Sequence, residues 1–142
     1  MCYSIYLSTN YNGDLSVWNS ELITFKKMHP SEVAGHFLKF KNIWYVGSKS
    51  QCSCTFRHIS ASELGFSPPE DWYEEQGDEI AGTRIFIHKV RNILMNNHPV
   101  DCIDIWHDSM QSEIAEKTVN LSSLNEDQFR FFENYYFLFS CE

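Results

Sequence analysis

The sequence predicts an α+β protein in which a mixed or antiparallel sheet of about six strands is covered by one long helix. Short runs rich in β-branched and aromatic residues alternate between apolar and polar positions, which is typical of strands. Residues 78–97 instead repeat their apolar side chains every three or four positions, which is typical of an amphipathic helix. The 142 residues, 43% of them hydrophobic, suffice for a single domain over 1–142.

Strands are expected where a short β-rich run is bounded by turn residues. Residues 10–14 carry turn chemistry after the first run, and His29-Pro30 ends the second. Gly47-Ser48 ends the third run, and a fourth strand is expected soon after it. The expected strands are residues 3–8, 21–27, 43–48, 52–58, 100–107 and 117–121.

Helix boundaries follow from capping residues. Asp14 is a candidate cap for a short turn through Asn19, and Ser31 for a short helix over 32–39. The long helix begins with acids that suit a helix N-terminus, and an Asn-Asn-His-Pro sequence ends it. Its apolar stripe consists of Thr83, Phe86, Ile87, Val90, Ile93 and Leu94.

The C-terminal segment is dense in aromatic residues and is expected to form a hairpin. Residues 129–132 and 135–139 flank Glu133-Asn134, which has the length of a two-residue turn. Because both faces carry aromatic side chains, the segment is either a buried part of the sheet or an interaction surface. We expect burial, and both a monomer and a homodimer stay open.

Composition restricts the partners and the compartment. The net charge of −8 does not suit a nucleic-acid phosphate backbone, so no nucleic-acid partner is expected. No run of eighteen apolar residues is present, and the N-terminus has no basic region, so neither a membrane span nor a signal peptide is expected. The default compartment is therefore the cytoplasm. Five cysteines without a Cys-x-x-Cys pair argue against a disulfide scaffold.

The densest group of chemically active side chains surrounds Cys52 and Cys54. In an extended strand both thiols share one face, His58 shares it by parity, and Cys2 is a candidate from an adjacent strand. Three interpretations stay open. The thiols fill core space, they bind Zn or Cu(I) together with Cys2 and His58, or they form a redox-responsive pair whose thiolate is favoured by Arg57 or His58.

Arg57 needs a partner if it is buried, because an unpaired buried charge is costly. Asp101 and Asp104, in the strand after the long helix, are the candidates. Asp104 shares parity with apolar neighbours. It is therefore either a structural lock paired with Arg57 or a functional acid with a raised pKa. Cys102 is expected in the core and Cys141 at the surface.

Six stretches of the chain carry a resemblance to known sequences. They are Met1-Cys2, Gly47-Ser48, Cys52–His58, Glu63–Phe66, Pro69–Tyr73 and Val100–Trp106. Together they resemble a family of small uncharacterised bacterial proteins over nearly the whole chain. The resemblance implies that the Cys-Ser-Cys-x-Phe-Arg run recurs in that family, and it implies no activity and no catalytic residue.

Two function classes follow. The first is a small cytoplasmic protein whose thiol site binds a soft metal or responds to redox conditions. The alternative is a non-catalytic acidic module that binds or inhibits a basic protein, which rests on the net charge and on the acidic-aromatic segment 70–79. No nucleophile, base and orienting residue occur in a recognisable pattern, so enzymatic activity stays an open question.

Overall fold

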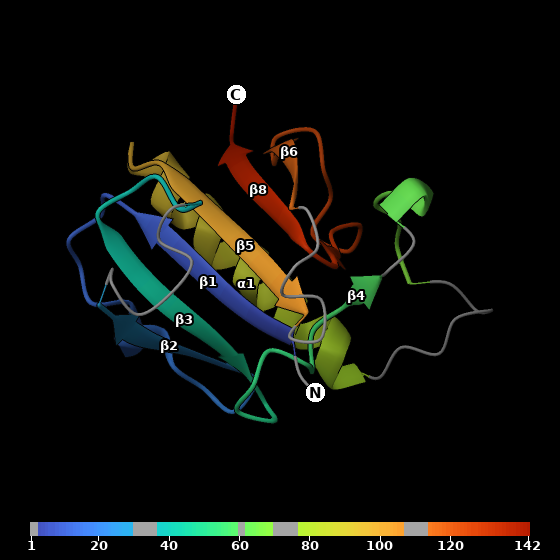
Figure 1. The fold of residues 1–142 in the computed structure, drawn as a ribbon, viewed down its shortest axis with the longest axis horizontal. Coiled ribbons are helices and arrows are strands. Elements are labelled where there is room, and N and C mark those ends of the chain that lie inside the picture. Colours follow the sequence, from blue (N-terminus) through green and yellow to red (C-terminus); the bar gives the residue numbers. More distant parts are fainter. Residues whose placement is uncertain (1–2, 30–36, 60–61, 70–76, 107–113) are drawn as a thin grey trace.

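The computed structural model describes residues 3–29, 37–59, 62–69, 77–106 and 114–142. Six strands form one sheet in the order β2-β3-β1-β5-β8-β6, and β4 and β7 form a second, two-stranded sheet. The long helix α1 lies along one face of the larger sheet, behind β1 and β5 in Figure 1, so the predicted α+β fold is confirmed. The elements are β1 (Tyr3–Thr9), η1 (Leu15–Trp18), β2 (Ile23–Met28), β3 (Asn42–Ser48), β4 (His58–Ile59), η3 (Ser62–Leu64), α1 (Gly77–Met95), β5 (Val100–Trp106), β6 (Ala115–Asn120), β7 (Phe131–Phe132) and β8 (Tyr135–Ser140).

The larger sheet is mixed. Its neighbouring strands are antiparallel except β6 and β8, which run parallel. A parallel pair needs a crossover of about a dozen residues, and the chain between β6 and β8 supplies it. Five of the predicted strands correspond to β1, β2, β3, β5 and β6, with ends that differ by a few residues.

Helix α1 buries the predicted apolar stripe against the sheet. Thr83, Phe86, Ile87, Val90 and Ile93 are all buried. The helix ends as the Asn-Asn-His sequence predicts. Asn97 takes a left-handed φ of 67°, its N–H donates to Leu94 O at 3.0 Å, and the N–H of His98 donates to Ile93 O at 3.2 Å. These two bonds form a Schellman motif, which satisfies the last carbonyls of the helix.

The core between α1 and the sheet is rich in aromatic residues. The ring of Phe86 lies 5.1 Å from that of Phe131 and 6.4 Å from that of Phe129. Phe129 in turn contacts Phe137 at 5.6 Å, with an edge-to-face angle of 66°. Such tilted and edge-to-face pairs stabilise the core beyond the area that they bury. The C-terminal aromatic residues are therefore core residues, as expected.

The C-terminal hairpin needs a correction. Residues 131–132 and 135–140 form strands on either side of Glu133-Asn134, but the two strands do not pair with each other. β7 pairs with β4 in the small sheet, where the Phe131 N–H donates to Arg57 O at 2.8 Å. β8 instead lies between β5 and β6. The reason is that β7 and β8 pair with other strands of the chain, so the turn at Glu133-Asn134 connects the small sheet to the large sheet.

The predicted strand over 52–58 is wrong. Only His58–Ile59 is extended and paired, and the residues from Lys49 to Arg57 form a loop. The side chains of Ser48 and Ser53 hydrogen-bond to the backbone in this stretch and so replace a strand ladder. The expected helix over 32–39 falls mostly outside the described residues.

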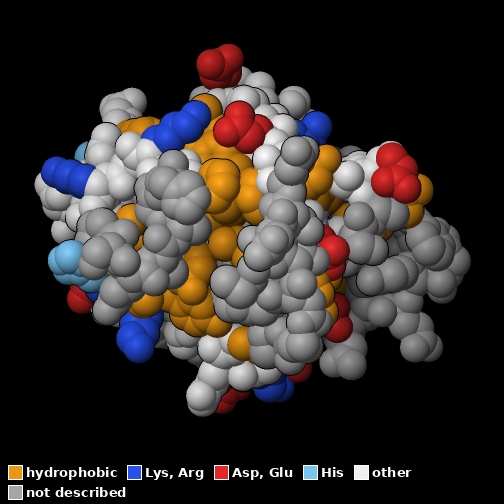
Figure 2. All heavy atoms as spheres, viewed as in Figure 1, with side chains coloured by type: hydrophobic (Ala, Val, Ile, Leu, Met, Phe, Trp, Pro, Cys, Tyr) orange, Lys and Arg blue, Asp and Glu red, His pale blue; other side chains and the backbone are white. Residues whose placement is uncertain are grey.

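The sheet face turned away from α1 carries a smaller buried cluster. Ile43, Ile103 and Tyr136 belong to it, together with Leu38 from the segment before β3. Figure 2, seen from the same side as Figure 1, shows hydrophobic side chains gathered over the middle of this face. Both faces of β5 are therefore buried, which accounts for the apolar residues that the strand carries on each face beside its two acids.

Replacing Phe86 with alanine tests the aromatic core. Because Phe86 is fully buried between α1 and the C-terminal rings, we expect the free energy of unfolding to fall by about 3–5 kcal/mol. Met95→Ala, on the same helix but 69% exposed, is the matched control and should change stability by less than about 0.5 kcal/mol. Urea denaturation followed by circular dichroism measures both, and equal losses for the two variants would contradict the packing described.

Candidate functional site

The loop between β3 and β4 is built around Ser48. Its backbone N–H and its hydroxyl both donate to the carbonyl of Cys52, at 2.7 and 2.6 Å. The N–H of Thr55 donates to the Ser48 hydroxyl at 2.9 Å. Gln51 completes the tight turn with a left-handed φ of 71°. One buried serine thus fixes the backbone on both sides of Cys52.

Ser53 is a second brace. It is fully buried, its hydroxyl donates to Val46 O at 2.6 Å, and it accepts the N–H of Ile5 at 2.9 Å. The loop is therefore joined to the central strands β1 and β3. This preorganisation is the kind that a functional loop needs, because it holds neighbouring side chains in place.

Cys52 and Cys54 lie on either side of Ser53, and both are half-buried. The Sγ of Cys52 lies 3.4 Å from the Ser50 hydroxyl. The two thiols do not share a strand face as predicted, because their segment is a loop. Cys2 lies outside the described residues. Cys102 is buried and Cys141 exposed, as expected, and burial raises the pKa of the Cys102 thiol.

Within the described ranges, no group of three or more His, Cys, Asp or Glu side chains is arranged to hold a metal ion. A zinc or copper site at Cys52 and Cys54 would therefore need a ligand from residues beyond those ranges. Cys2 is the candidate that the sequence offers.

The partners expected for Arg57 are wrong, because its side chain pairs with neither Asp101 nor Asp104. The side chain is only 2% exposed. Its guanidinium donates to the carbonyls of Asp127 at 2.7 Å, Phe129 at 2.9 Å and Ser67 at 2.8 Å. Arg57 therefore binds backbone carbonyls of two irregular segments and holds them on the core.

His58 is the residue that reaches Asp104. The Nε2 atom lies 3.3 Å from Asp104 Oδ1 and 3.2 Å from Oδ2, and Nδ1 lies 3.1 Å from the carbonyl of Phe56. The imidazole stacks on Tyr3 with ring centres 3.8 Å apart and an interplanar angle of 11°. Both carboxylate and imidazole are buried, so the pair is a structural lock between the two sheets.

The neighbours of His58 restrict its protonation. The carbonyl of Phe56 only accepts, so Nδ1 carries a proton. Nε2 then either accepts from a protonated Asp104 or donates to an ionised one. Oδ2 of Asp104 has no well-aligned hydrogen bond among the described residues, although Nε2 is close. Burial raises the pKa of Asp104, and the interaction with the His58 imidazole opposes that shift.

Asp101 lies on the opposite face of β5. It accepts from the hydroxyl of Ser8, from the hydroxyl of Tyr136 at 2.6 Å and from the N–H of Lys39 at 2.9 Å. Burial raises the pKa of Asp101, and the three hydrogen bonds oppose that shift. Burial, followed by the bond to Asp101, also raises the pKa of Tyr136. Asp101 therefore ties β1, β8 and the segment before β3 together.

Sequence reasoning missed the serines that hold the loop and the position of β2 at the sheet edge. The signal for the first was the serine-rich run from Ser48 to Ser53, because serine favours local bonds to the backbone. The signal for the second was the adjacent pair Lys26-Lys27, because lysines are typical of edge strands.

Comparison with known proteins adds no relative: no family model, curated protein or solved structure matches the chain. Of the helices in the described ranges, none combines the length and apolar character needed to cross a membrane. The function therefore has to be argued from the geometry.

Two replacements of Asp104 test the lock with His58. Asparagine can still form a hydrogen bond with Nε2 of His58, as donor or as acceptor, whereas leucine leaves this buried nitrogen without a partner at position 104. We therefore expect Asp104→Leu to be about 1–3 kcal/mol less stable than Asp104→Asn in urea denaturation. Glu116→Gln, an acid-to-amide change at an exposed position of β6, is the control and should leave stability unchanged. An asparagine variant as unstable as the leucine one would contradict a hydrogen bond between the side chain at position 104 and His58.

The raised pKa of Asp101 predicts a pH dependence of stability. An acid whose pKa is higher in the folded protein than its unfolded value of 3.8 stabilises the folded state fully at pH values below 3.8. This contribution is lost as the pH rises through the pKa of the folded state. The stability of the natural protein relative to Asp101→Asn should therefore fall between about pH 3 and pH 7. Parallel denaturation curves over this range measure it, and a relative stability that rises with pH would show the opposite shift.

Proposed function

We propose that the protein carries a reversible thiol site at Cys52 and Cys54, through which it responds to redox conditions. One observation carries this proposal: two half-buried cysteines flank a fully buried serine on a loop that is hydrogen-bonded to the central strands. Half-buried thiols stay reachable by small disulfides, in contrast to the buried Cys102.

The reaction is thiol–disulfide exchange with a small disulfide such as oxidised glutathione. One cysteine thiolate attacks the glutathione disulfide, and one glutathione leaves and takes a proton. The second cysteine, once deprotonated, attacks the mixed disulfide and releases the second glutathione. Two protein thiols are oxidised to one disulfide, and one glutathione disulfide is reduced to two thiols. The ring closed by Cys-x-Cys is small, so we expect this disulfide to be easily reduced.

A soft-metal site is the alternative for the same cysteines, with Cys2 and His58 as further ligands for Zn or Cu(I). It is less well supported because the two nitrogens of His58 already face Phe56 O and Asp104. Metal binding through His58 would have to break one of these buried contacts.

The cytoplasm is the compartment that suits such a site, because its glutathione pool keeps thiols reduced until conditions change. The alternative of an acidic module for a basic partner has less support. Several surface acids pair within the chain, namely Asp78 with Lys49, Asp127 with Arg84 and Glu126 with Arg91. That alternative rests on the net charge and on the segment 70–79, of which residues 70–76 lie outside the described ranges.

Peptide mapping by mass spectrometry after treatment with oxidised glutathione tests the thiol proposal. We expect a Cys52–Cys54 disulfide that reduced glutathione reverses, whereas Cys52→Ser and Cys54→Ser should stop at a mixed disulfide. The exposed Cys141 is the internal control and should form only the mixed disulfide.

Two outcomes would overturn the thiol proposal. One is that Cys52 and Cys54 react only after the protein unfolds, as we expect for the buried Cys102. The other is stoichiometric zinc or copper, measured by elemental analysis of protein purified without chelators and lost in Cys52→Ser. That result would establish the metal alternative.

A further inference from the structure

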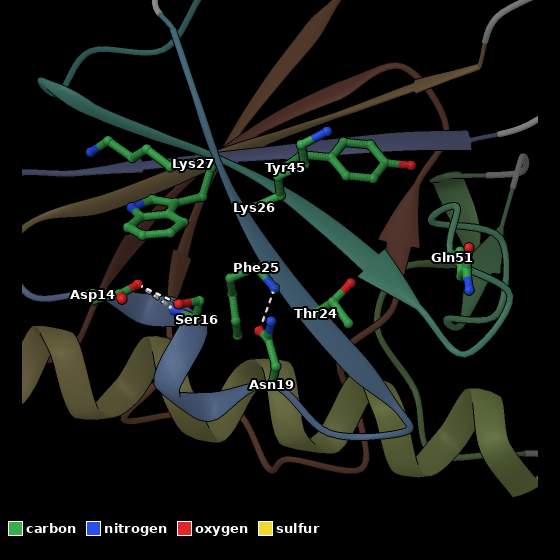
Figure 3. A pocket seen from close by; sticks show the side chains of 10 residues that line it. Asp14, Ser16, Asn19, Thr24, Phe25, Lys26, Lys27, Tyr45 and Gln51 are labelled. Carbon is green, nitrogen blue, oxygen red and sulfur yellow. Dashed lines mark hydrogen bonds between the residues drawn. The ribbon is translucent and has the colours of Figure 1, made fainter.

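A groove runs along the outer edge of β2, the terminal strand of the large sheet. It encloses about 750 Å³ and is lined by residues of β2 and β3, by the η1 segment and by Gln51. Gln51 belongs to the loop from Lys49 to Arg57 that carries Cys52 and Cys54, which we call the thiol loop. Figure 3 shows Phe25 directed toward α1, whereas Lys26 and Tyr45 point to the opposite side of the strand. The groove therefore follows an exposed strand edge and has side-chain surfaces on both sides of it.

The backbone of β2 is open to a further strand at one end. The N–H of Phe25 is capped by the Asn19 side chain at 2.7 Å, and the carbonyl of Ile23 by the N–H of Ser20 at 2.8 Å. Ile23 and Phe25 therefore direct their backbone N–H and C=O groups away from β3. Because this direction alternates along a strand, Lys27 also directs its backbone groups away from β3, and no described residue bonds to them on that side. The edge is thus blocked near η1 and unblocked at Lys27.

The open end of the edge is positively charged, although the whole chain carries a charge of −8. Lys26 and Lys27 are exposed, and no described carboxylate lies within ion-pair distance of either. Partial burial, and then the nearby Lys41, lower the pKa of Lys27. Asp14 also lines the groove, but its carboxylate is held by the N–H and hydroxyl of Ser16. An acidic ligand would relieve the repulsion among the lysines.

Trp44 supplies an independent sign of a missing ligand. Its side chain is only 4% exposed and lines the groove, and its Nε1 donor is buried without a hydrogen-bond partner among the described residues. The ammonium of Lys27 lies 5.0 Å from the centre of the same ring. A buried donor normally has an acceptor. A ligand oxygen between Lys27 and Trp44 would accept a hydrogen bond from Nε1 and would also lie next to the ammonium.

We propose that the β2 edge binds an extended acidic segment of another protein, which adds a strand to the sheet beside Lys27. In strand addition the main chain of the ligand bonds to the edge, and alternate side chains enter the pockets on either face. The carboxylates of the ligand would lie on the face of Lys27 and Trp44, which are opposite each other in the β2–β3 register, and its apolar side chains on the face of Lys26 and Tyr45. A second copy of this chain is a poor occupant, because antiparallel pairing of two β2 edges places lysines against lysines.

Fluorescence anisotropy with a labelled, end-blocked peptide of alternating glutamate and valine tests the proposal on the full chain. We expect saturable binding that weakens as salt is added, because exposed charge contacts are screened. The matching lysine–valine peptide should not bind. In an NMR titration the indole N–H signal of Trp44, assigned with Trp44→Phe, should shift with the acidic peptide.

Three variants locate the binding. Lys27→Glu should abolish it, whereas Lys117→Glu, the same change on the opposite edge strand β6, should leave it unchanged. Lys27→Pro removes the outward N–H together with the ammonium but no bond to β3, so the fold should persist while affinity falls by roughly tenfold or more. The proposal is overturned if the acidic peptide does not bind, if Lys27→Glu and Lys117→Glu bind alike, or if the basic peptide binds better. A circular dichroism spectrum that Lys27→Pro leaves unchanged verifies the fold.

Discussion

The buried guanidinium of Arg57 is the constraint on which the irregular half of the structure depends. Buried carbonyls need donors, and Arg57 supplies them to Ser67, Asp127 and Phe129. Arg130 does the same for Gly65, with 2.7 Å from its Nε to the carbonyl. These bonds hold long connections against the core. They also fix the small sheet, whose strands of two residues each could not persist alone. Only then does His58 reach Asp104 on β5.

β5 joins this arrangement to the large sheet through two buried acids. Asp101 and Asp104 are three residues apart and therefore face opposite sides of the strand. Their environments differ: Asp101 accepts three hydrogen bonds, whereas Asp104 depends on one imidazole. A slip of β5 by one residue would move both acids onto the wrong face and separate them from their donors. The acids thus specify the register of the central strand, at the expense of burying two groups whose ionisation is unfavourable.

The sequence was sufficient for the parts of the fold that depend on local periodicity. The stripe of α1, its Asn97 terminus and the Asp14 cap, whose carboxylate accepts the Ser16 N–H at 2.9 Å, were all predictable. The candidate site was predicted less well, since a Cys-Ser-Cys run suits a strand as well as a loop until the partners of Ser48 and Ser53 are known. Which groups Arg57 and His58 contact depends on the order of the strands in space, and the alternation of side chains along one strand cannot give that order. For the same reason the pair Lys26-Lys27, although typical of edge strands, was not enough to place β2 at the sheet edge or to show the groove beside it.

The thiol loop and the groove meet at one corner of the molecule. Gln51 lines the groove and directly precedes Cys52. Gly47 makes this meeting feasible, because a Cβ there would lie 2.6 Å from Thr24 Oγ1 and 3.1 Å from the carbonyl of Gln51. The carbonyl of Cys52 is held by two donors of Ser48, so little slack exists between the thiols and the edge strand. The proposed modification of Cys52 and the proposed occupation of the groove would therefore both act on this tightly packed turn, so the oxidation state of the protein has to be fixed before its affinity for a peptide is compared between variants.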